Sequence, residues 1–477
     1  MAHIGIIGAG ISGLTTALLL RRKGHSVSVF DGSDQAGGAM RTARDEAGWI
    51  AEWGPNTIIE SSGRIKRLIS ILNLEDRRIY PGSLAQKRYI VRDHKMVAVP
   101  ASFRQLLSTP LLSRSAKLAV LREPLVRRKQ GESAPDESLA DFVRRRLGEE
   151  FLNWPIDALV GGIYAGDPEL LSVKHAFPRL ALLEEQHGSL IVGQLKGGVK
   201  RPVGSDEIPR NKAAIFSFDR GLQVLPETLR DHLGDAVRFG SRVTGISAVD
   251  SGRHWKVTLT GSDNPPETFD ALIYAGTAYG LQDIKIPEEL ALFLSPLTEI
   301  AHPPVVSLTL GFRREDIAHP LDGFGVLVPG VENFSILGTL FTSSLFPNRA
   351  PDRNHVTLTT YLGGMRQPEI AEKGQEEQVK RVIDALHSLL GVTGEPLYQH
   401  RILWSKAIPQ YQVGYGRLLE LMNRAEHDHS GFYLSGNYRT GISVGDSINA
   451  AFDLAERVHR DIGTSGSHMA HNIENTE

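Results

Sequence analysis

A glycine-rich segment near the start of the chain constrains the fold more than any other feature. Residues 4–7 (IGII) have the pattern of a short buried strand, and GxGxxG follows at once, leading into an apolar helix over 14–22. A second strand over 27–30 ends at an acid. This order predicts a dinucleotide-binding unit, with a pyrophosphate at the helix N-terminus and a ribose hydroxyl on the acid. The residues of this unit expected to bind the cofactor are Gly8, Gly10, Ser12, Gly13 and Asp31.

A second motif follows the acid directly. Gly37, Gly38, Arg41 and Thr42 form GGxxRT. The simple alternative is a glycine turn with a solvated arginine. The extension resembles that of flavoproteins related to the amine oxidases, in which the paired glycines and the arginine approach the pyrophosphate of FAD. The resemblance therefore adds Gly37, Gly38 and Arg41 to the expected cofactor site.

Composition limits the class of protein. The chain has 477 residues, a net charge of -2 and no cysteine. This length favours two or three domains, and the near-neutral charge gives no reason to expect nucleic-acid binding. Without cysteine, disulfides, iron–sulfur ligation and a cysteinyl link to a flavin are excluded. No apolar run reaches the roughly 18 residues of a membrane span, and no signal peptide is visible. We therefore expect a cytoplasmic protein, with peripheral contact to the inner face of a membrane as an extension of this expectation.

Dinucleotide-type pieces are scattered along the chain, with other segments inserted between them. We expect an α/β fold with a Rossmann-like FAD-binding domain, an inserted α+β substrate domain whose sheet is mixed or antiparallel, and a helical, membrane-facing domain. The expected boundaries are 1–80, 205–285 and 400–462 for the FAD-binding domain, 81–100 and 286–399 for the substrate domain, 101–204 for the helical domain, and 463–477 for a disordered tail.

The inserted segments resemble the protoporphyrinogen oxidases, most closely the membrane-associated plant type. The resemblance covers nearly the whole chain and includes EWGPN (52–56), KRYIVRD (87–93), VGGIYAGDPELLSV (160–173) and GNYRTGISVGDSI (436–448). It implies oxidation of protoporphyrinogen IX to protoporphyrin IX by hydride transfer to non-covalent FAD, with oxygen as the second substrate and hydrogen peroxide as a product, in haem or chlorophyll biosynthesis. Three alternatives stay open: a coproporphyrinogen III oxidase, another amine-oxidase-like flavin oxidase or desaturase, and a non-enzymatic flavin-binding partner protein.

The resemblance also implies a substrate site. Arg88 lies on a predicted strand, and a guanidinium suits a propionate because it donates two parallel bonds. A structural ion pair is the alternative, and the neighbouring Lys87 and Arg92 are expected to be solvated. Periodicity alone would make several of the other matching positions ordinary core residues. The remaining expected substrate-binding residues are Asn56, Gly162, Ile163, Leu327, Leu340 and Tyr361.

Further cofactor contacts are expected near the C-terminus. A glycine-rich turn over 436–445 precedes a helix, and such turns bind anions or polar ring edges through backbone N–H groups. The resemblance adds Gly54, Val243 and Trp404, which lie in three separate segments of the chain. These expected cofactor residues are Gly54, Val243, Trp404, Gly436 and Val444. The sequence offers no candidate general base and no metal site.

Residues 102–129 are basic, leucine-rich and helical in pattern. This composition is typical of a helix on a membrane surface, and a solvated basic face on a packed helical domain is the alternative. A homodimer and a contact with the next enzyme of the pathway, a chelatase, are further expectations.

Overall fold

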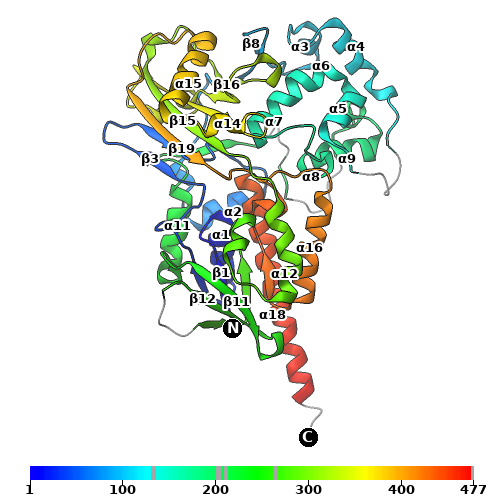
Figure 1. Ribbon diagram of the computed structural model, residues 1–477, viewed down its shortest axis with the longest axis vertical. Coiled ribbons are helices and arrows are strands. Elements are labelled where there is room, and N and C mark those ends of the chain that lie inside the picture. Colours follow the sequence, from blue (N-terminus) through cyan, green and yellow to red (C-terminus); the bar gives the residue numbers. More distant parts are fainter. Residues whose placement is uncertain (130–135, 200–205, 209–212, 262–265, 474–477) are drawn as a thin grey trace.

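The computed structural model describes residues 1–129, 136–199, 206–208, 213–261 and 266–473. Figure 1 shows two parts along the longest axis of the molecule. The lower part contains the N-terminal strand, α1 and the last helix, and the upper part contains a large sheet with a group of helices beside it.

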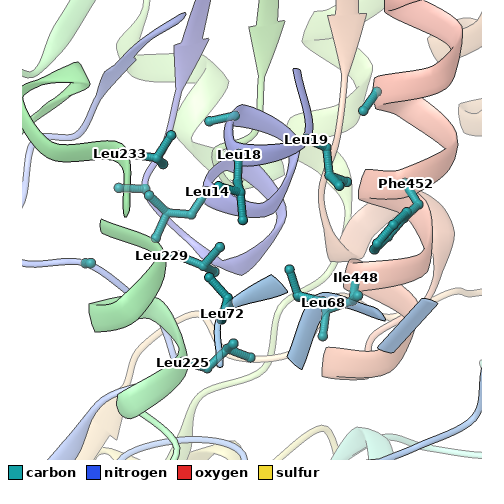
Figure 2. Packing of buried hydrophobic residues seen from close by; sticks show 14 of the residues in the cluster. Leu14, Leu18, Leu19, Leu68, Leu72, Leu225, Leu229, Leu233, Ile448 and Phe452 are labelled. Atoms are coloured by element: carbon teal, nitrogen blue, oxygen red, sulfur yellow. The ribbon is translucent and has the colours of Figure 1, made fainter. Parts of the chain in front are cut away.

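The lower part is built on a parallel sheet. Its strand order is β10 (Val237–Arg238), β2 (Ser26–Phe30), β1 (His3–Ile7), β14 (Ala271–Tyr274) and β20 (Phe432–Leu434). The strands are almost wholly apolar because helices cover the sheet. The helix α1 (Ile11–Arg22) packs between α11 (Val224–Leu233) and α18 (Val444–Ile473). Figure 2 shows Leu14 and Leu18 on the side of Leu229, with Leu19 facing Phe452. The dinucleotide-binding unit predicted from GxGxxG is therefore present.

Smaller elements complete the lower part. A three-stranded sheet is formed by β11 (Val243–Val249), β12 (His254–Leu259) and β13 (Glu267–Phe269). A hairpin of β3 (Thr42–Arg44) and β4 (Ile50–Glu52) lies at the boundary with the upper part (Figure 1). The strand β9 (Ile215–Phe218) pairs with β5 (Ile58–Ile59) and β6 (Arg78–Ile79). The helices are α2 (Gly63–Ile71), α12 (Glu288–Leu294), α16 (Tyr415–Asp428) and the short α17 (Asn437–Thr440).

The upper part is built on a seven-stranded sheet. The order is β19 (Tyr398–Trp404), β15 (Val305–Arg313), β18 (His355–Gly363), β17 (Gly338–Leu340), β16 (Gly323–Leu327), β7 (Lys87–Arg92) and β8 (Lys95–Ala98). Only the β16–β7 pair is parallel, so the sheet is mixed. One face packs against α14 (Pro368–Ala371) and α15 (Gln375–Leu390) in an apolar core. The other face is left for the site.

A group of short helices stands beside the seven-stranded sheet (Figure 1). Its members are α3 (Phe103–Ser108), α4 (Arg114–Arg122), α5 (Leu139–Leu147), α6 (Glu149–Phe151), α7 (Asp157–Tyr164), α8 (Val173–Ala176), α9 (Pro178–His187) and α10 (Leu190–Leu195). The fully buried Arg146 lies inside it, ion-paired with Glu123 and Glu184. Across the described ranges, no helix is both long and apolar enough to cross a bilayer.

Some elements differ from expectation. Neither β19 nor α16 was predicted from the sequence, although Tyr415, Leu418 and Met422 have the spacing of a buried helical face. The strand β19 lies at the sheet edge and alternates weakly, which explains its faint signal. The tail was expected to be disordered from Gly463, but α18 continues to Ile473 and extends past the body of the molecule (Figure 1). No proline interrupts this extension, and elongating an existing helix is easier than starting one. Residues 474–477 lie outside the described part.

Candidate functional site

The first glycine turn leaves room at one position only. Gly8 has a φ of +113°, and a Cβ there would lie 2.7 Å from the Ala275 carbonyl oxygen. A Cβ on Gly13 would lie 2.0 Å from the Gly8 carbonyl oxygen. These two glycines are required by the packing of the protein itself. Gly10 differs, because no heavy atom of the described chain beyond its own neighbours in sequence lies within 4 Å of its Cβ position. The open space is at the N-terminus of α1, where unpaired backbone N–H groups attract phosphate; the buried Ser12 lies in that first turn.

The second glycine pair lies against the first turn. Gly37, with a φ of +119°, forms a parallel bridge with Gly10. Gly38 has a φ of +59°, and its Cβ position is 3.6 Å from the Gly10 Cα. The Arg41 guanidinium lies 5.4 Å from the centre of the Trp53 ring, and its Nε is buried with no hydrogen-bond partner in the described chain. A cation with an unsatisfied donor beside an open glycine turn suits a pyrophosphate.

The Asp31 carboxylate follows β2 and accepts hydrogen bonds that fix the glycine turn. Its Oδ2 accepts from the Ala9 amide at 2.6 Å, and its Oδ1 accepts from the amide and hydroxyl of Ser33 at 2.8 and 2.5 Å. A carboxylate has about four acceptor positions, so a ribose hydroxyl would add to an acid that already fixes the turn. The Asp31 carbonyl accepts from the Ser241 amide at 2.9 Å, which brings the segment leading to Val243 alongside.

The C-terminal turn meets the carboxyl end of the parallel sheet. Gly436 has a φ of +149°, and a Cβ there would lie 2.6 Å from the Tyr438 ring and 3.3 Å from the carbonyl oxygen of Gly276, just after β14. The Tyr411 hydroxyl spans the turn, donating to the Asn437 carbonyl and accepting from the Gly441 amide. Val444 then begins α18 in the same core as α1. Ligands of such folds bind at this edge of the sheet.

Two tryptophans connect this edge to the upper sheet. Trp404, at the end of β19, donates its Nε1–H to the Trp53 carbonyl at 2.9 Å. The Nε1 of Trp53 itself is buried and has no partner within the described ranges. A Cβ on Gly54 would lie 2.7 Å from the Ala39 carbonyl oxygen, so the chain can pass only without a side chain. His400 lies 6.0 Å from Trp53, and burial lowers the pKa of its imidazole. Neither Trp53 nor His400 was predicted from the sequence. Trp53 lies in the EWGPN segment, where only Gly54 and Asn56 were given a role, and His400 lies in no quoted motif.

The strand register puts the expected apolar residues on one face of the upper sheet. Leu327 pairs with Gly338, and Gly338 pairs with Tyr361, while Leu340 lies two residues further along β17. Directly paired residues and residues two apart share a face. This is the face opposite α15, since the intervening Val326 belongs to the core beneath that helix. Leu327, Leu340 and Tyr361 are therefore brought together on this face, outside the apolar core beneath α15.

The helix α7 approaches this face through two glycines. A Cβ on Gly161 would lie 2.4 Å from Nη2 of Arg366, and a Cβ on Gly162 would lie 2.5 Å from a methyl group of Leu327. The glycines inside this helix are thus explained by close packing on two sides. The next residue, Ile163, is 39 % exposed. Gly162, Ile163 and Leu327 form one continuous wall.

Asn56 joins the lower part to the same wall. Its Nδ2 donates to the Tyr361 hydroxyl at 2.7 Å and to the Gly54 carbonyl at 3.2 Å. Its Oδ1 is buried and unpartnered among the residues that the structure describes. Burial raises the pKa of the Tyr361 phenol, so this hydroxyl stays protonated at neutral pH.

Arg88 is the unpaired cation of its strand. By alternation it shares a face with Ile90, the partner of Leu327. Its guanidinium lies 5.4 Å from the centre of the Phe324 ring, and the described chain provides it with no carboxylate. Lys87, by contrast, pairs with Asp322 at 2.5 Å.

The expectation of a solvated Arg92 was wrong. Its side chain is 17 % exposed, pairs with Glu150 at 3.2 Å and stacks 3.7 Å from the centre of the Trp154 ring. A helix that packs over the strand supplies both partners, and a sequence pattern cannot show such a neighbour.

A buried ion pair behind the GGxxRT turn was also missed. The Nη2 of Arg349 donates to Glu52 at 3.2 Å and to the Ser217 hydroxyl at 2.6 Å. The other oxygen of Glu52 accepts from the Thr42 hydroxyl at 2.7 Å. Burial raises the pKa of Glu52, and Arg349 opposes this rise. The two residues are 297 positions apart, so no local signal could have paired them.

The geometry fits a long, anionic cofactor with a polar ring system. Unsatisfied buried donors and acceptors on Arg41, Trp53 and Asn56 run from the open glycine turn to the apolar wall. Arg41 contacts Trp53, whose carbonyl accepts from Trp404, and the separate Asn56–Tyr361 bond lies nearer the apolar wall. Among the residues that can be described, no group of three His, Asp or Glu side chains could hold a metal ion.

Comparisons with known proteins identify the family of the chain. The family model "Flavin containing amine oxidoreductase" matches residues 11–459. Protoporphyrinogen oxidase 2, chloroplastic/mitochondrial, of Arabidopsis thaliana is 35 % identical, with 96 % of this chain and 93 % of that protein covered. Protoporphyrinogen oxidase of Homo sapiens is 30 % identical, with 95 % and 97 % covered.

Solved structures show the same fold. A crystal structure described as a candidate protoporphyrinogen oxidase from Exiguobacterium sp. 255-15 superposes with a TM-score of 0.77 at 22 % identity, covering 96 % of this chain and 99 % of that one. Cyclohexylamine oxidase from Brevibacterium oxydans gives a TM-score of 0.70 at 17 % identity, with 97 % and 99 % covered.

Proposed function

The chain belongs to the family of flavin-containing amine oxidoreductases, and from this membership we propose that it oxidises protoporphyrinogen IX to protoporphyrin IX. The relatives at 30 to 35 % identity that carry this activity in their names support the proposal. Six electrons leave the macrocycle in three two-electron steps, so three oxygen molecules are reduced to three molecules of hydrogen peroxide. When bound, FAD supplies the hydride acceptor that the chain's own side chains lack.

Residues of the lower part would hold that cofactor without a covalent bond. The open space at Gly10 and the free Nε of Arg41 are suited to the pyrophosphate. The Gly436 turn and Trp404, at the sheet edge and the boundary between the two parts, are suited to the remainder of the molecule. Because the chain has no cysteine, a thioether link to the flavin is excluded.

The observation that carries the proposed substrate is the composition of the open sheet face. Leu327, Leu340 and Tyr361 share this face with Arg88, whose guanidinium has no carboxylate partner in the described chain. Protoporphyrinogen IX has broad apolar faces and carries its two carboxylates on one edge. Apolar walls would bind the ring, and one free cation would fix its orientation.

The test is turnover of two porphyrinogens by the flavin-loaded protein. Porphyrin fluorescence and hydrogen peroxide should both appear with protoporphyrinogen IX, in a ratio of three peroxides to one porphyrin. Faster oxidation of coproporphyrinogen III would replace the proposed substrate with that alternative. If the flavin-loaded protein oxidises neither compound, the proposal that its substrate is a porphyrinogen is wrong.

We further propose that the 102–129 segment is a membrane-contact surface, which would place the protein at the periphery of a bilayer. Several leucines of α3, α4 and the turn after α4 are exposed: Leu107 by 48 %, Leu118 by 53 %, Leu121 by 46 % and Leu125 by 84 %. Exposed basic residues such as Arg114, Arg122 and Arg127 lie between them. Apolar side chains interspersed with cations suit an anionic interface.

A further inference from the structure

A second guanidinium lies beside the proposed substrate wall, and it is already paired. Arg366 follows β18, and its Nη1 donates to the Asp157 carboxylate at the start of α7. The two side chains are only 16 % and 14 % exposed. The pair therefore lies at the boundary between the helical group and the upper sheet, away from bulk water.

The position of Arg366 relative to the wall follows from α7. Asp157 and Gly161 are one helical turn apart on the same face, and the Arg366 guanidinium extends from one to the other, with Nη2 packed directly on Gly161. The following glycine, Gly162, packs on Leu327. One residue of helix thus separates the guanidinium from the wall expected to contact the substrate.

The cations near this wall differ in whether a carboxylate holds them. Lys87 pairs with Asp322, Arg92 with Glu150, and Arg366 with Asp157. Arg88 is the exception within the described residues. The charge available to an anionic substrate is consequently smaller than the number of basic residues suggests.

Porphyrinogens differ in how many carboxylates they carry. Protoporphyrinogen IX has two propionates and two vinyl groups, whereas coproporphyrinogen III has propionates at all four of these positions. An additional carboxylate needs an additional cation, because a charged group moved from water into a partly buried site must be paired.

We propose that Asp157 is a specificity-determining residue, which holds Arg366 and so withholds a second cation from porphyrinogens with four carboxylates. The inference depends on the proposed function, since it concerns the choice between two substrates of that same site. A substrate carboxylate would have to displace one that is part of the chain and is therefore present at high effective concentration. Without Asp157, Arg366 would be a buried cation that lacks a partner and gains most from an extra propionate.

Asp157→Asn is a mild test because it changes charge and preserves shape. The oxygen of Asp157 that accepts from Arg366 also accepts from the Gly330 amide at 2.6 Å, and an asparagine oxygen can stay in that place, so the variant removes only the negative charge that holds Arg366. Glu377→Gln is the matched control. It likewise neutralises the partner of an arginine, Arg381, but on α15, behind the opposite face of the sheet.

The experiment compares kcat/KM for protoporphyrinogen IX and coproporphyrinogen III in four flavin-loaded proteins: the unaltered chain, Asp157→Asn, Asp157→Asn with Arg366→Gln, and Glu377→Gln. In Asp157→Asn, the preference should move toward coproporphyrinogen by about tenfold, the scale of one charge-assisted hydrogen bond. In the double variant, the ratio of the two kcat/KM values should equal that of the unaltered chain. In Glu377→Gln, this ratio should not change.

Three results would overturn the inference. An unchanged ratio in a folded, flavin-loaded Asp157→Asn would make the pair a structural contact only. A shifted ratio that persists in the double variant would show that Arg366 does not mediate the effect. If the unaltered protein oxidises neither compound, the proposed function fails first and the inference fails with it, whereas the first two results leave that function intact.

Discussion

The Asn56 amide donates to the Tyr361 hydroxyl at 2.7 Å and so bonds the loop after the dinucleotide unit to the middle of the upper sheet. The two residues are 305 positions apart in the chain. They lie between the proposed cofactor residues and the proposed substrate wall, so changes on either side should be detectable through this bond.

Tyr361→Phe should test the structural weight of that bond. The change leaves the Asn56 amide with only its longer bond to Gly54, so the free energy of unfolding should fall by about 1 kcal/mol. Denaturant titration measures this fall, and the flavin content should not change. A variant as stable as the unaltered protein would mean that water replaces the hydroxyl at no cost.

Gly10→Val should abolish flavin binding while leaving the protein folded. No described heavy atom lies within 4 Å of the Cβ position, so the new side chain fills space that only a ligand needs. Gly13→Val is the contrasting variant, because its Cβ would collide with a carbonyl oxygen of the turn itself and should cost stability. Visible absorbance and circular dichroism separate the two outcomes. Full flavin occupancy in Gly10→Val would refute the phosphate role of this turn.

Arg88→Ala should lower the catalytic efficiency for protoporphyrinogen by about 10- to 150-fold, the range expected for loss of one charge-assisted bond to a propionate. Flavin absorbance should stay normal, because no proposed cofactor residue contacts Arg88. Lys87→Ala is the control on the same strand, since Lys87 already pairs with Asp322. Equal losses in both variants would point to damage of the strand and not to substrate recognition.

Glu426 should make the C-terminal turn sensitive to acid. Burial raises the pKa of this carboxyl, but bonds from Arg457 and Arg439 outweigh burial, so its pKa lies below the usual range. A lowered pKa stabilises the fold above the unfolded value of about 4.3, and this stabilisation disappears as the pH falls through the folded value.

Glu426→Gln should therefore cost about 3 kcal/mol of unfolding free energy at pH 7, the scale of a broken buried pair. The difference in unfolding free energy between the variant and the unaltered protein should become smaller below about pH 4. Denaturant titrations at several pH values measure it. A gap that stays constant down to pH 3 would show that the carboxylate charge is not the source.

The 102–129 segment should draw the protein to anionic vesicles. Leucines can enter the interface while each basic residue near the surface contributes about 1 kcal/mol, and the attraction should weaken with salt because it is screened over about 10 Å at roughly 0.1 M. Arg122→Gln with Arg127→Gln should reduce sedimentation with vesicles. Lys373→Gln with Lys380→Gln, exposed charges on and beside α15, should not. If both double variants lose vesicle sedimentation to the same extent, the attraction depends on net charge alone and not on the 102–129 segment.

Local patterns predicted the parts of the fold that local physics determines. The glycine turn, α1 and the first two strands of the parallel sheet follow from spacing and periodicity, because each depends on neighbours within a few residues. The edge strand β19 was missed, since an edge needs no strong alternation. The seven-stranded register that puts Leu327 and Tyr361 on one face could not be read from either residue alone.

Paired charges were the least predictable part of the candidate site. Arg92 looked solvated, and the Glu52–Arg349 and Asp157–Arg366 pairs gave no signal at all. In each case the partner comes from a distant segment, so its presence depends on tertiary packing. That Arg88 lacks a carboxylate partner within the described ranges could be recognised only when the partners of Lys87 and Arg92 were known.

The two main sheets share one property that bears on how the chain is made. The strand β7 pairs with β16, which lies more than 200 residues later in the chain. The parallel sheet that contains β1 is completed only by β20, at residues 432–434. At roughly 5 to 20 residues per second, the first strand leaves the ribosome on the order of a minute before the last strand of its sheet exists. Until the later strands are made, β1 can pair only with β2, and β7 only with β8. Closure of both sheets therefore depends on long-range contacts, which slow folding.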